Sequence, residues 1–437
     1  MDGFYRKIIL IFGDIVCLYI ATKLAIILKA ETPFKNDLYF KFLIILIMSL
    51  FIFFNIYGLF SLIRKRLTEI FLSLIAAVIN MFTVALAVTF LFSEFEYSRY
   101  IIIVSAILSF VLLAFWQYIM HKWEVHSMPK YKIMILAIAE EQQRLEEKFN
   151  NTYGMSDCIK IYSTFDEDIN WKQKINSCDL VIVGETLSIA NREKIMHYAK
   201  FKRKIVILVP TFYEICCMNM YLWKVDDLPT QRVSRMLLTL EQRVLKRTLD
   251  MSVATVAIIL LAPIMLLTAI IVKFDSPGPI IYSQERVGMF GRLFKVHKFR
   301  SMRQDAEAKS GPVFACQNDS RVTRFGRFMR ATRLDELPQL FNVLSGDMSI
   351  VGPRPERPCF VEQFIAEKPE YAYRHNVKPG ITGLAQVAGK YNTTAYDKLV
   401  YDLIYIQRVS VIYDLTLMLQ TLKVLISKSS TEGVQVK

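Results

Sequence analysis

The chain begins with four long apolar stretches that are separated by short polar segments. They cover about residues 8–28, 40–62, 71–92 and 100–119, and each approaches the ~20 residues that a helix needs to cross a bilayer. The first stretch lacks the small-residue cleavage site of a signal peptide, and the second follows it at once. The pattern therefore predicts four membrane-spanning helices within residues 1–122.

The positive charges between these stretches predict their orientation. Arg6 precedes the first stretch, residues 64–66 (Arg-Lys-Arg) separate the second from the third, and Lys122 follows the fourth. The loop between the third and fourth stretches carries Glu94 instead. Because Lys and Arg are retained on the cytoplasmic side of a membrane, both ends of the bundle are expected to face the cytoplasm.

One acidic residue, Asp14, lies inside the first apolar stretch. A charge is costly there, so such residues are candidates for function. Asp14 is close to the cytoplasmic edge of the span, which favours a structural hydrogen-bonding role.

From about residue 131 the apolar runs become short and alternate with polar helical segments. Apolar runs of strand length that alternate with helices are typical of a parallel sheet. We therefore expect a small Rossmann-like domain over residues 123–240. The predicted strands cover residues 131–138, 179–184 and 204–210, and the predicted helices cover about 139–150 and 189–201.

The first strand-to-helix turn of this domain reads Ala137-Ile-Ala-Glu-Glu141 and contains no GxGxxG pattern. A dinucleotide pyrophosphate needs glycines at that turn, and two acidic residues there would repel it. The domain is therefore interpreted as a regulatory or oligomerisation module with an empty nucleotide site.

A fifth apolar run covers residues 251–272 and contains Pro263 near its midpoint. Its length alone would permit a full membrane crossing. However, Lys246 and Arg247 precede it and Lys273 follows it, so neither flank favours the outer side. Proline near the middle predicts a kink.

The segment from Arg330 to Gly346 holds a carboxylate pair, Asp335-Glu336. Apolar residues recur at helical spacing, so one face of the segment is predicted to be buried. Pro338 is tolerated only in a first turn, which predicts a helix that starts near Leu334 or Asp335 and stops at Ser345-Gly346. The residues of the predicted buried face are Leu334, Leu337, Phe341 and Leu344.

Basic residues surround this pair in the sequence. Arg330 and Arg333 precede it, and Arg354 follows it between two prolines that fix the backbone. Another basic run, residues 295–307, carries Lys298 and Arg300. Taken alone, Asp335 reads as an ordinary N-cap and the arginines as a solvated face. Together, stiffly held arginines beside two carboxylates at a helix start predict a site for a metal and a diphosphate.

Two later features allow more than one interpretation. Residues 378–389 form a glycine-punctuated loop whose backbone amides can approach a ligand, although turns alone also explain its glycines. Its possible substrate-binding residues are Gly380, Thr382, Gly383 and Gln386. A predicted C-terminal helix, about residues 395–427, contains Asp402 and Asp414 and suits either a membrane interface or core packing.

Composition narrows the class of protein. Hydrophobic residues make up 53% of the 437 residues, which is too high for an ordinary soluble enzyme. The net charge of +14 suits anionic lipids or phosphorylated substrates, and no nucleic-acid module accompanies it. Seven cysteines without CxxC spacing fit a reducing environment, and the absence of HExxH or a comparable cluster argues against zinc.

Three segments of the sequence carry a resemblance to a known family. Residues 284–288 (QERVG), residues 334–356 (LDELPQLFNVLSGDMSIVGPRPE) and residues 377–386 (VKPGITGLAQ) resemble the bacterial sugar transferases. These are polyprenyl-phosphate glycosyl-1-phosphate transferases that initiate exopolysaccharide, capsule or O-antigen synthesis. The resemblance covers roughly residues 240–425. The membrane spans and small α/β domain ahead of it look like the large members of the family.

The resemblance implies a mechanism. Asp335 would attack the sugar-bearing phosphorus of a UDP-sugar, release UMP and carry a covalent phosphosugar, which polyprenyl phosphate then accepts. Glu336, with Asp335, would hold Mg²⁺ (or Mn²⁺). Arg354, Arg330, Arg333, Lys298 and Arg300 would bind phosphate oxygens.

The resemblance also implies a location and an architecture. The run around Pro263, about residues 249–273, would be a re-entrant helix that dips into one leaflet and returns. We expect a multi-pass protein of the bacterial inner (cytoplasmic) membrane with its soluble domains facing the cytoplasm. Its expected partners are a UDP-sugar, undecaprenyl phosphate, membrane lipids and a second copy of itself, and not nucleic acid.

The predicted fold class is therefore a membrane protein of the α plus α/β type. It comprises a four-helix transmembrane bundle (1–122), the Rossmann-like domain (123–240) and a C-terminal α/β catalytic domain with the re-entrant helix (241–437).

Two other classes remain open from the sequence alone. One is a non-catalytic membrane scaffold for polysaccharide assembly, against which the intact Asp335, Glu336 and Arg354 argue. The other is a polytopic polyprenyl-phosphate transferase, which would place its acidic motifs in loops between many spans. Here they lie on one segment.

Overall fold

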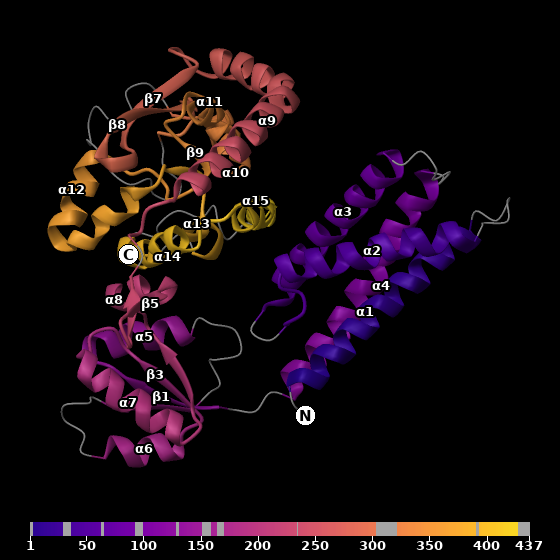
Figure 1. Ribbon diagram of the computed structural model, residues 1–437. Helices are drawn as coiled ribbons and strands as arrows, with labels where there is room; N and C mark the ends of the chain where they lie inside the picture. The colour runs from indigo at the N-terminus through magenta and orange to yellow at the C-terminus, as the bar shows by residue number, and fades with distance from the viewer. Residues whose placement is uncertain are drawn as a thin grey trace. The chain divides into compact units, whose positions relative to one another are not determined.

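Four long helices account for the first apolar part of the chain (Figure 1). They are α1 (Gly3–Ile27), α2 (Asn36–Ile56), α3 (Leu67–Leu91) and α4 (Arg99–His126). Each contains a stretch long and apolar enough to cross a membrane, as predicted. α1 packs along α4, and α3 packs against both α2 and α4. The last helix extends to His126, four residues past the predicted boundary at residue 122.

The computed structural model describes most of the chain. It groups the chain into two units, Met1–Pro210 and Thr211–Lys437. Glu94 and residues 303–307 of the second basic run lie outside the described residues. The described residues are 3–28, 36–62, 65–91, 99–127, 131–150, 159–163, 170–233, 235–302, 321–389 and 393–426.

Asp14 has the structural role that the sequence favoured. Its side chain is completely buried between helices, and Gln117 of α4 donates a hydrogen bond from Nε2 to Oδ1 over 3.0 Å. The pairing satisfies a polar group that would otherwise be costly among apolar side chains.

The rest of the first unit contains a four-stranded parallel sheet with the strand order β2-β1-β3-β4. Three strands and two helices lie where the sequence predicted them, whereas β2 and α6 were missed. Alternate residues of β1 enter two apolar clusters on opposite faces of the sheet. The elements are β1 (Lys132–Leu136), α5 (Ala139–Asn150), β2 (Ile159–Ser163), α6 (Trp171–Ser177), β3 (Leu180–Val183), α7 (Ile189–Phe201) and β4 (Ile205–Leu208).

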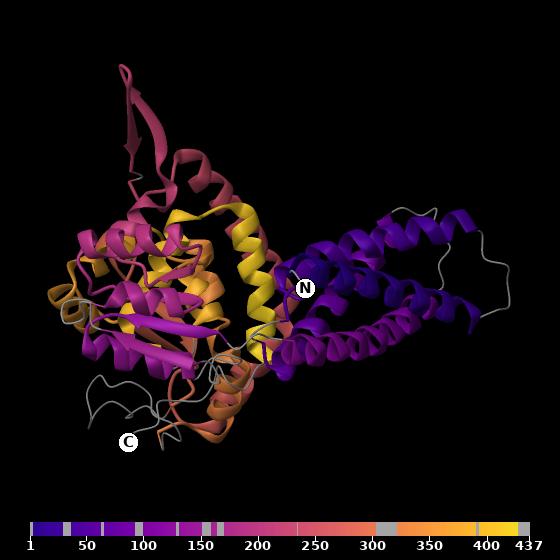
Figure 2. The same cartoon turned by 90° about the horizontal axis from the view of Figure 1, so that it is seen from below.

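The second unit starts at Thr211 and so includes the connector, which the predicted domain division placed with the Rossmann-like domain. Ile215 and Met236, from the connector, are 1% and 4% exposed because they pack into the core of this unit. The connector comprises α8 (Phe212–Cys216), η1 (Cys217–Asn219), β5 (Tyr221–Val225) and β6 (Leu228–Arg232). β5 and β6 form an antiparallel hairpin that extends away from the rest of the unit (Figure 2).

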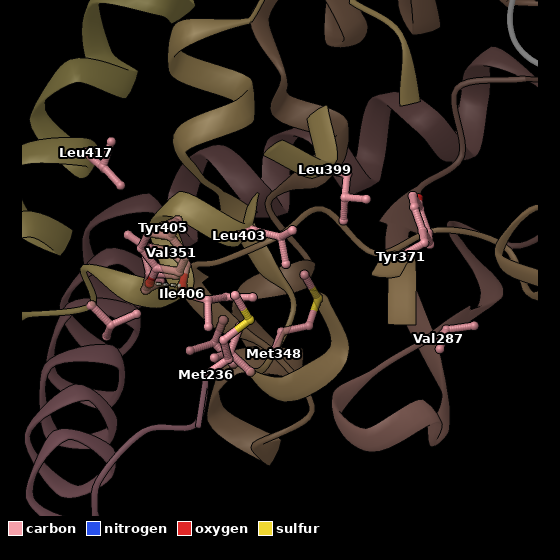
Figure 3. Packing of buried hydrophobic residues seen from close by; sticks show 14 of the residues in the cluster. Met236, Val287, Met348, Val351, Tyr371, Leu399, Leu403, Tyr405, Ile406 and Leu417 are labelled. Carbon is pink, nitrogen blue, oxygen red and sulfur yellow. Dashed lines mark hydrogen bonds between the residues drawn. The ribbon is translucent and has the colours of Figure 1, made fainter. Parts of the chain in front are cut away.

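The core of the second unit joins short strands to the C-terminal helices (Figure 3). β7 (Ile281–Val287) and β8 (Leu293–Phe299) are antiparallel, and β9 (Ser349–Val351) pairs in parallel with β10 (Gly380–Thr382). The helices after α9 (Leu240–Asp275) are η2 (Met289–Gly291), α10 (Arg324–Thr332), η3 (Leu334–Glu336), α11 (Gln339–Ser345), α12 (Pro358–Glu367), η4 (Pro369–Asn376), α13 (Leu384–Ala388), α14 (Ala395–Gln407) and α15 (Val411–Ile426).

The predicted C-terminal helix is two helices, α14 and α15, separated at residues 408–410. Asp402 and Asp414 are 2% and 0% exposed, so core packing describes both positions. Lys246 lies 2.7 Å from Asp414, and the Tyr405 hydroxyl donates to the same carboxylate over 2.8 Å. Residue 427, the predicted helix end, lies outside the described residues.

The fifth apolar run belongs to α9 (Leu240–Asp275), a helix of 36 residues. Thr239 and Gln242 form a capping box at its start, where each side chain bonds the backbone of the other. Pro263 lies inside the helix, which continues on both sides of it while the ribbon changes direction along its length (Figure 1). The large apolar side chains near the middle are exposed, with Leu260 at 71% and Leu266 at 65%.

Candidate active site

The carboxylate pair lies on a short 3₁₀ turn between two helices. Asp335 and Glu336 belong to η3, and the α-helix that follows begins only at Gln339, with Pro338 as its N-cap residue. The predicted helix start near Leu334 or Asp335 is therefore wrong by about one turn. The predicted stop is confirmed, since Gly346 ends α11 in the left-handed conformation (φ 96°).

The predicted buried face is also displaced. Phe341 is 50% exposed, while its neighbours Leu340 and Val343 enter the core. Leu334 and Leu337 are only partly buried, against a cluster around Val272 of α9. A 3₁₀ turn has three residues per turn, so the 3.6-residue spacing counted from Leu334 does not continue into α11.

Glu336 is a buried anion that several cations surround. Its side chain is 10% exposed, and Lys298 Nζ lies 2.8 Å from its Oε1, to which Arg354 also donates a hydrogen bond. Arg333 Nη1 lies 3.9 Å from the other oxygen. Burial alone would raise the pKa of Glu336, but the charges and hydrogen bonds of Arg354 and Lys298 outweigh it and hold that pKa well below its ordinary value.

Asp335 has the opposite environment. It is 8% exposed, and no residue that the structure describes donates a hydrogen bond to its carboxyl group. Burial, and then the negative charge of Glu336, raise the pKa of Asp335 to about 6 against the opposing charges of Lys298, Arg330 and Arg354. The two neighbouring carboxyl groups are therefore unequal, since the pKa of Glu336 is lowered and the pKa of Asp335 is raised to about 6.

The cations around Glu336 are only partly buried. The side chains of Arg354, Arg333 and Lys298 are 38%, 30% and 27% exposed. Arg330 is the fourth cation, and its Nε donates a hydrogen bond to Ser301 Oγ over 3.0 Å. Each of these side chains lies near Glu336 or Asp335 and is also partly exposed to solvent. Together they form a positive surface at which an anionic ligand can bind.

Arg300 is not brought into this group. Its guanidinium donates to the carbonyls of Val272, Ser276 and Pro279 at the C-terminal end of α9. It is 5% exposed and satisfies carbonyls that a helix end leaves unpaired. We therefore leave Arg300 out of the phosphate-binding set that the sequence predicted.

The glycine-punctuated loop owes its glycines to backbone packing. A Cβ atom on Gly380 would lie 2.1 Å from the Gly352 nitrogen, and one on Gly383 would lie 2.2 Å from the Gly352 oxygen. Thr382 Oγ1 lies 2.7 Å from Thr421 Oγ1. The amide group of Gln386 is buried and has no hydrogen-bond partner among the described residues. The loop thus supports the segment that carries Arg354.

Sequence reasoning missed two ion pairs around that segment. Arg374 and Asp402 form a buried ion pair, 2.9 Å apart, and Arg286 lies 3.5 Å from Glu356. Asp402 was noted only as a polar position on an amphipathic helix. No local pattern distinguishes such residues, because their partners lie far away in the sequence.

The sequence of the chain is similar to a known protein family over the part that carries this site. A family model described as "Bacterial sugar transferase" matches residues 241–428. The chain is 44% identical over 207 residues to the UDP-N-acetylgalactosamine-undecaprenyl-phosphate N-acetylgalactosaminephosphotransferase of Aeromonas hydrophila, a match that covers 47% of this chain and 49% of that protein. The chain thus spans about half the length of this relative.

Two shorter relatives are covered more completely. One is the UDP-glucose:undecaprenyl-phosphate glucose-1-phosphate transferase of Caulobacter vibrioides, 43% identical over 191 residues, which are 42% of this chain and 70% of that protein. The other is the exopolysaccharide production protein PSS of Rhizobium leguminosarum, 41% identical over 189 residues, which are 41% of this chain and 93% of that protein.

Proposed function

Since this chain belongs to the bacterial sugar transferase family, we propose that it transfers a sugar-1-phosphate from a UDP-sugar to undecaprenyl phosphate. The products are UMP and an undecaprenyl-diphosphate sugar, the first membrane-bound step of exopolysaccharide, capsule or O-antigen synthesis. The relatives with named activities are transferases of this kind. The observation that carries the proposal is the unequal carboxylate pair, in which Asp335 has no described donor while Glu336 is held by cations.

Asp335 is the proposed nucleophile. Its carboxylate oxygen attacks the sugar-bearing phosphorus, and the bond from that phosphorus to the oxygen of the UMP group breaks with its electron pair. An oxygen of undecaprenyl phosphate then attacks the same phosphorus and displaces the Asp335 carboxylate. A carboxylate without hydrogen-bond donors is a better nucleophile than one that accepts from Arg and Lys, which favours Asp335 over Glu336.

The cations around Glu336 are proposed to bind the diphosphate of the substrate. Arg354, Lys298, Arg333 and Arg330 bind phosphate oxygens of the diphosphate, and Glu336 keeps three of them in place. Phosphoryl transfer depends mostly on positioning and on stabilising negative charge, so a fixed group of cations is suited to it.

A divalent ion fits the site through Asp335. No cluster of three or more His, Cys, Asp or Glu side chains suited to a metal occurs in the described part of the chain. Mg²⁺ is commonly held by one or two carboxylates together with substrate phosphates, and Asp335 offers unpaired oxygens for this. We propose that Asp335, with Glu336 nearby, holds Mg²⁺ or Mn²⁺ with the diphosphate. When bound, the ion would neutralise phosphate charge.

The lipid substrate requires the site to lie at a membrane, and α9 supports this. Near the start of α9, Lys246 donates to the Val351 carbonyl over 2.9 Å. Near its end, the Val272 carbonyl accepts from Arg300 over 3.2 Å. Both ends of the helix thus bind the same unit, as expected of a re-entrant helix bent around Pro263. A full crossing of a ~30 Å bilayer would separate them.

The proposed location is the bacterial inner membrane, with this unit in the cytoplasm. UDP-sugars are made there, and the charges around the first four helices favour the same orientation. We propose that the protein forms a homodimer or a higher oligomer there.

The parallel sheet of the first unit is proposed to be a Rossmann-like module without a nucleotide. Glu141 of α5 accepts hydrogen bonds from the backbone nitrogens of Glu185 (2.8 Å) and Thr186 (3.1 Å) beyond the end of β3. A carboxylate thus occupies amides that could otherwise bind a phosphate. This favours a regulatory or oligomerisation role.

The test is release of UMP by the full-length protein in lipid nanodiscs. UDP-glucose, UDP-galactose and their N-acetylated forms are each supplied with undecaprenyl phosphate, because the relatives differ in the sugar they use. Repeated turnover, with more than one UMP released per protein, should occur with one or more of these sugars and only when undecaprenyl phosphate is supplied in excess over the protein. If no UDP-sugar gives UMP, the scaffold alternative replaces this proposal.

A further inference from the structure

The segment that carries Arg354 is held through its backbone carbonyls. In residues 352–356, Gly-Pro-Arg-Pro-Glu, the prolines have no N–H to donate. At the two ends of the segment the carbonyls bond backbone amides. Gly380 N donates to Pro353 O over 2.9 Å, and Val287 N donates to Glu356 O over 3.0 Å.

The two central carbonyls accept from arginine side chains instead. Arg374 Nη2 donates to the carbonyl of Arg354 over 2.8 Å. Arg286 Nη1 donates to the carbonyl of Pro355 over 3.3 Å. Each of the four carbonyls from residue 353 to 356 therefore has a donor.

Arg374 is itself rigidly placed. Its Nε donates to Asp402 Oδ2 over 3.1 Å, and its Nη1 donates to the Tyr371 hydroxyl over 2.6 Å. Arg374 and Asp402 are 5% and 2% exposed. A planar guanidinium with partners on all three nitrogens cannot rotate without breaking bonds, so it is a fixed point in the core.

This guanidinium restrains torsions that the prolines leave free. Pro353 and Pro355 fix their own φ angles, and Pro355 disfavours the α-region for Arg354 before it. The φ angle of Arg354 and the ψ angles of both prolines can still vary, so the peptide group after Arg354 can still turn. The hydrogen bond from Arg374 holds the carbonyl of that peptide, and the Arg354 side chain leaves the same residue towards Glu336.

We propose that Arg374, held by Asp402, is a positioning residue that orients Arg354 for the diphosphate of the substrate. Arg374 touches no reacting atom and acts through Arg354. The inference rests on the proposed function for its kinetic consequence, although the backbone geometry is independent of it. The competing explanation is that the Arg374–Asp402 pair only stabilises the core.

A double-mutant cycle in the full-length protein separates these explanations. Arg374→Gln should lower kcat for UMP release by about 10- to 100-fold, because a small misplacement of a catalytic group has an effect of this size. KM for the UDP-sugar should change less than threefold. In the Arg354→Ala background, Arg374→Gln should cost less than a further threefold. If the loss of kcat in the double variant equals the product of the losses in the two single variants, the two residues act independently and the proposal is overturned.

Two further variants control for stability. Arg374→Gln leaves the buried Asp402 without its partner, so the neutral pair Arg374→Gln/Asp402→Asn is made as well. It should unfold at a higher temperature than Arg374→Gln and still show the low kcat. Recovery of kcat together with stability would mean that the pair is only structural. Arg192→Gln is the matched control, because Arg192 is a 4% exposed arginine that donates to the carbonyls of Gly184 and Val209 in the first unit. It should keep wild-type kcat.

A measurement without turnover distinguishes failure of this inference from failure of the proposed function. The amides of Gly380 and Val287 report on this segment, because they donate to the carbonyls of Pro353 and Glu356. Their hydrogen–deuterium exchange should be at least tenfold faster in Arg374→Gln and in the neutral pair than in wild type or Arg192→Gln. Unchanged exchange would refute the positioning role even if the enzyme is active. Faster exchange in a protein that releases no UMP would leave the positioning role intact and refute the proposed function.

Discussion

Arg354 and Glu336 lie 18 residues apart in the sequence, yet the Arg354 guanidinium donates a hydrogen bond to the same Glu336 oxygen that Lys298 binds over 2.8 Å. Both cations donate to Glu336, and no described residue donates a hydrogen bond to the adjacent Asp335 carboxyl group. Neighbours that look equivalent in the sequence therefore have different environments. This difference supports the proposed roles, in which Glu336 holds the cations and Asp335 is the carboxyl group that reacts.

The two carboxylates should respond differently to isosteric substitution. Asp335→Asn is expected to reduce turnover by at least about 10⁴-fold, since the proposed nucleophile is removed. Glu336→Gln should retain measurable activity, about 10²- to 10³-fold below wild type, because it loosens the cations without removing the nucleophile. The measurement is UMP release at saturating undecaprenyl phosphate.

A covalent intermediate provides a second readout for the same pair. A UDP-sugar with labelled β-phosphate, supplied without lipid, should label the wild-type protein and Glu336→Gln at Asp335, and should leave Asp335→Asn unlabelled. Peptide mapping locates the label. Full turnover by Asp335→Asn would contradict the covalent mechanism.

The raised pKa of Asp335 predicts a pH-dependent stability. The folded protein holds the Asp335 proton up to a pKa of about 6, while an unfolded chain releases it near 3.8. The folded state therefore binds more protons between these values, and this group makes stability fall as pH rises from about 4 to 6. Asp335→Asn removes the effect and should stabilise the metal-free protein by up to about 3 kcal/mol at pH 8.

The comparison is made by denaturant unfolding in EDTA at pH 8 and near pH 4. The difference between Asp335→Asn and wild type should shrink towards zero at the lower pH. In the activity assay, the same pKa predicts that UMP release by wild type increases as pH rises through about 6, because the carboxylate form is the nucleophile. A stabilisation that is equal at both pH values would show that burial of the charge is not its cause.

The unit boundary at Thr211 predicts which fragment is stable. A fragment from Thr211 keeps Ile215 and Met236, whereas a fragment from Leu240 loses both from the core. Loss of a large buried side chain costs roughly 2–5 kcal/mol. The longer fragment should keep the kcat of the full chain in detergent, and the shorter one should unfold several degrees lower. If the longer fragment folds but is inactive, residues 1–210 contribute to the site.

The bend of α9 predicts a membrane topology. In a protein whose native cysteines have been replaced, Leu245→Cys and Ile281→Cys lie on either side of the apolar run of residues 251–272 and should both react only with a reagent on the cytoplasmic side. Pro263→Leu restores a backbone donor and removes the clash that bends the helix. It should favour a full crossing and lower activity. Reaction of Ile281→Cys from outside in the otherwise wild-type helix would refute the re-entrant topology.

The sequence by itself determined the local elements of this protein. Runs of ~20 apolar residues predict the four long helices, and short apolar runs predict three of the four parallel strands, because periodicity and length act within one segment. The motifs around Asp335, Glu336 and Arg354 predict a phosphate site for the same reason. The stop of α11 at Gly346 also follows locally, from the freedom of glycine at positive φ.

Only the tertiary structure decided how the charged residues divide their roles. Arg300 and Lys298 lie two residues apart on the same run, yet one caps the end of α9 and the other binds Glu336. Ile215 and Met236 belong to the second unit because the side chains that they pack against are in its core. A side chain's partners, and through them its pKa and orientation, come from residues that are distant in the sequence, and a local pattern contains no information about those distances.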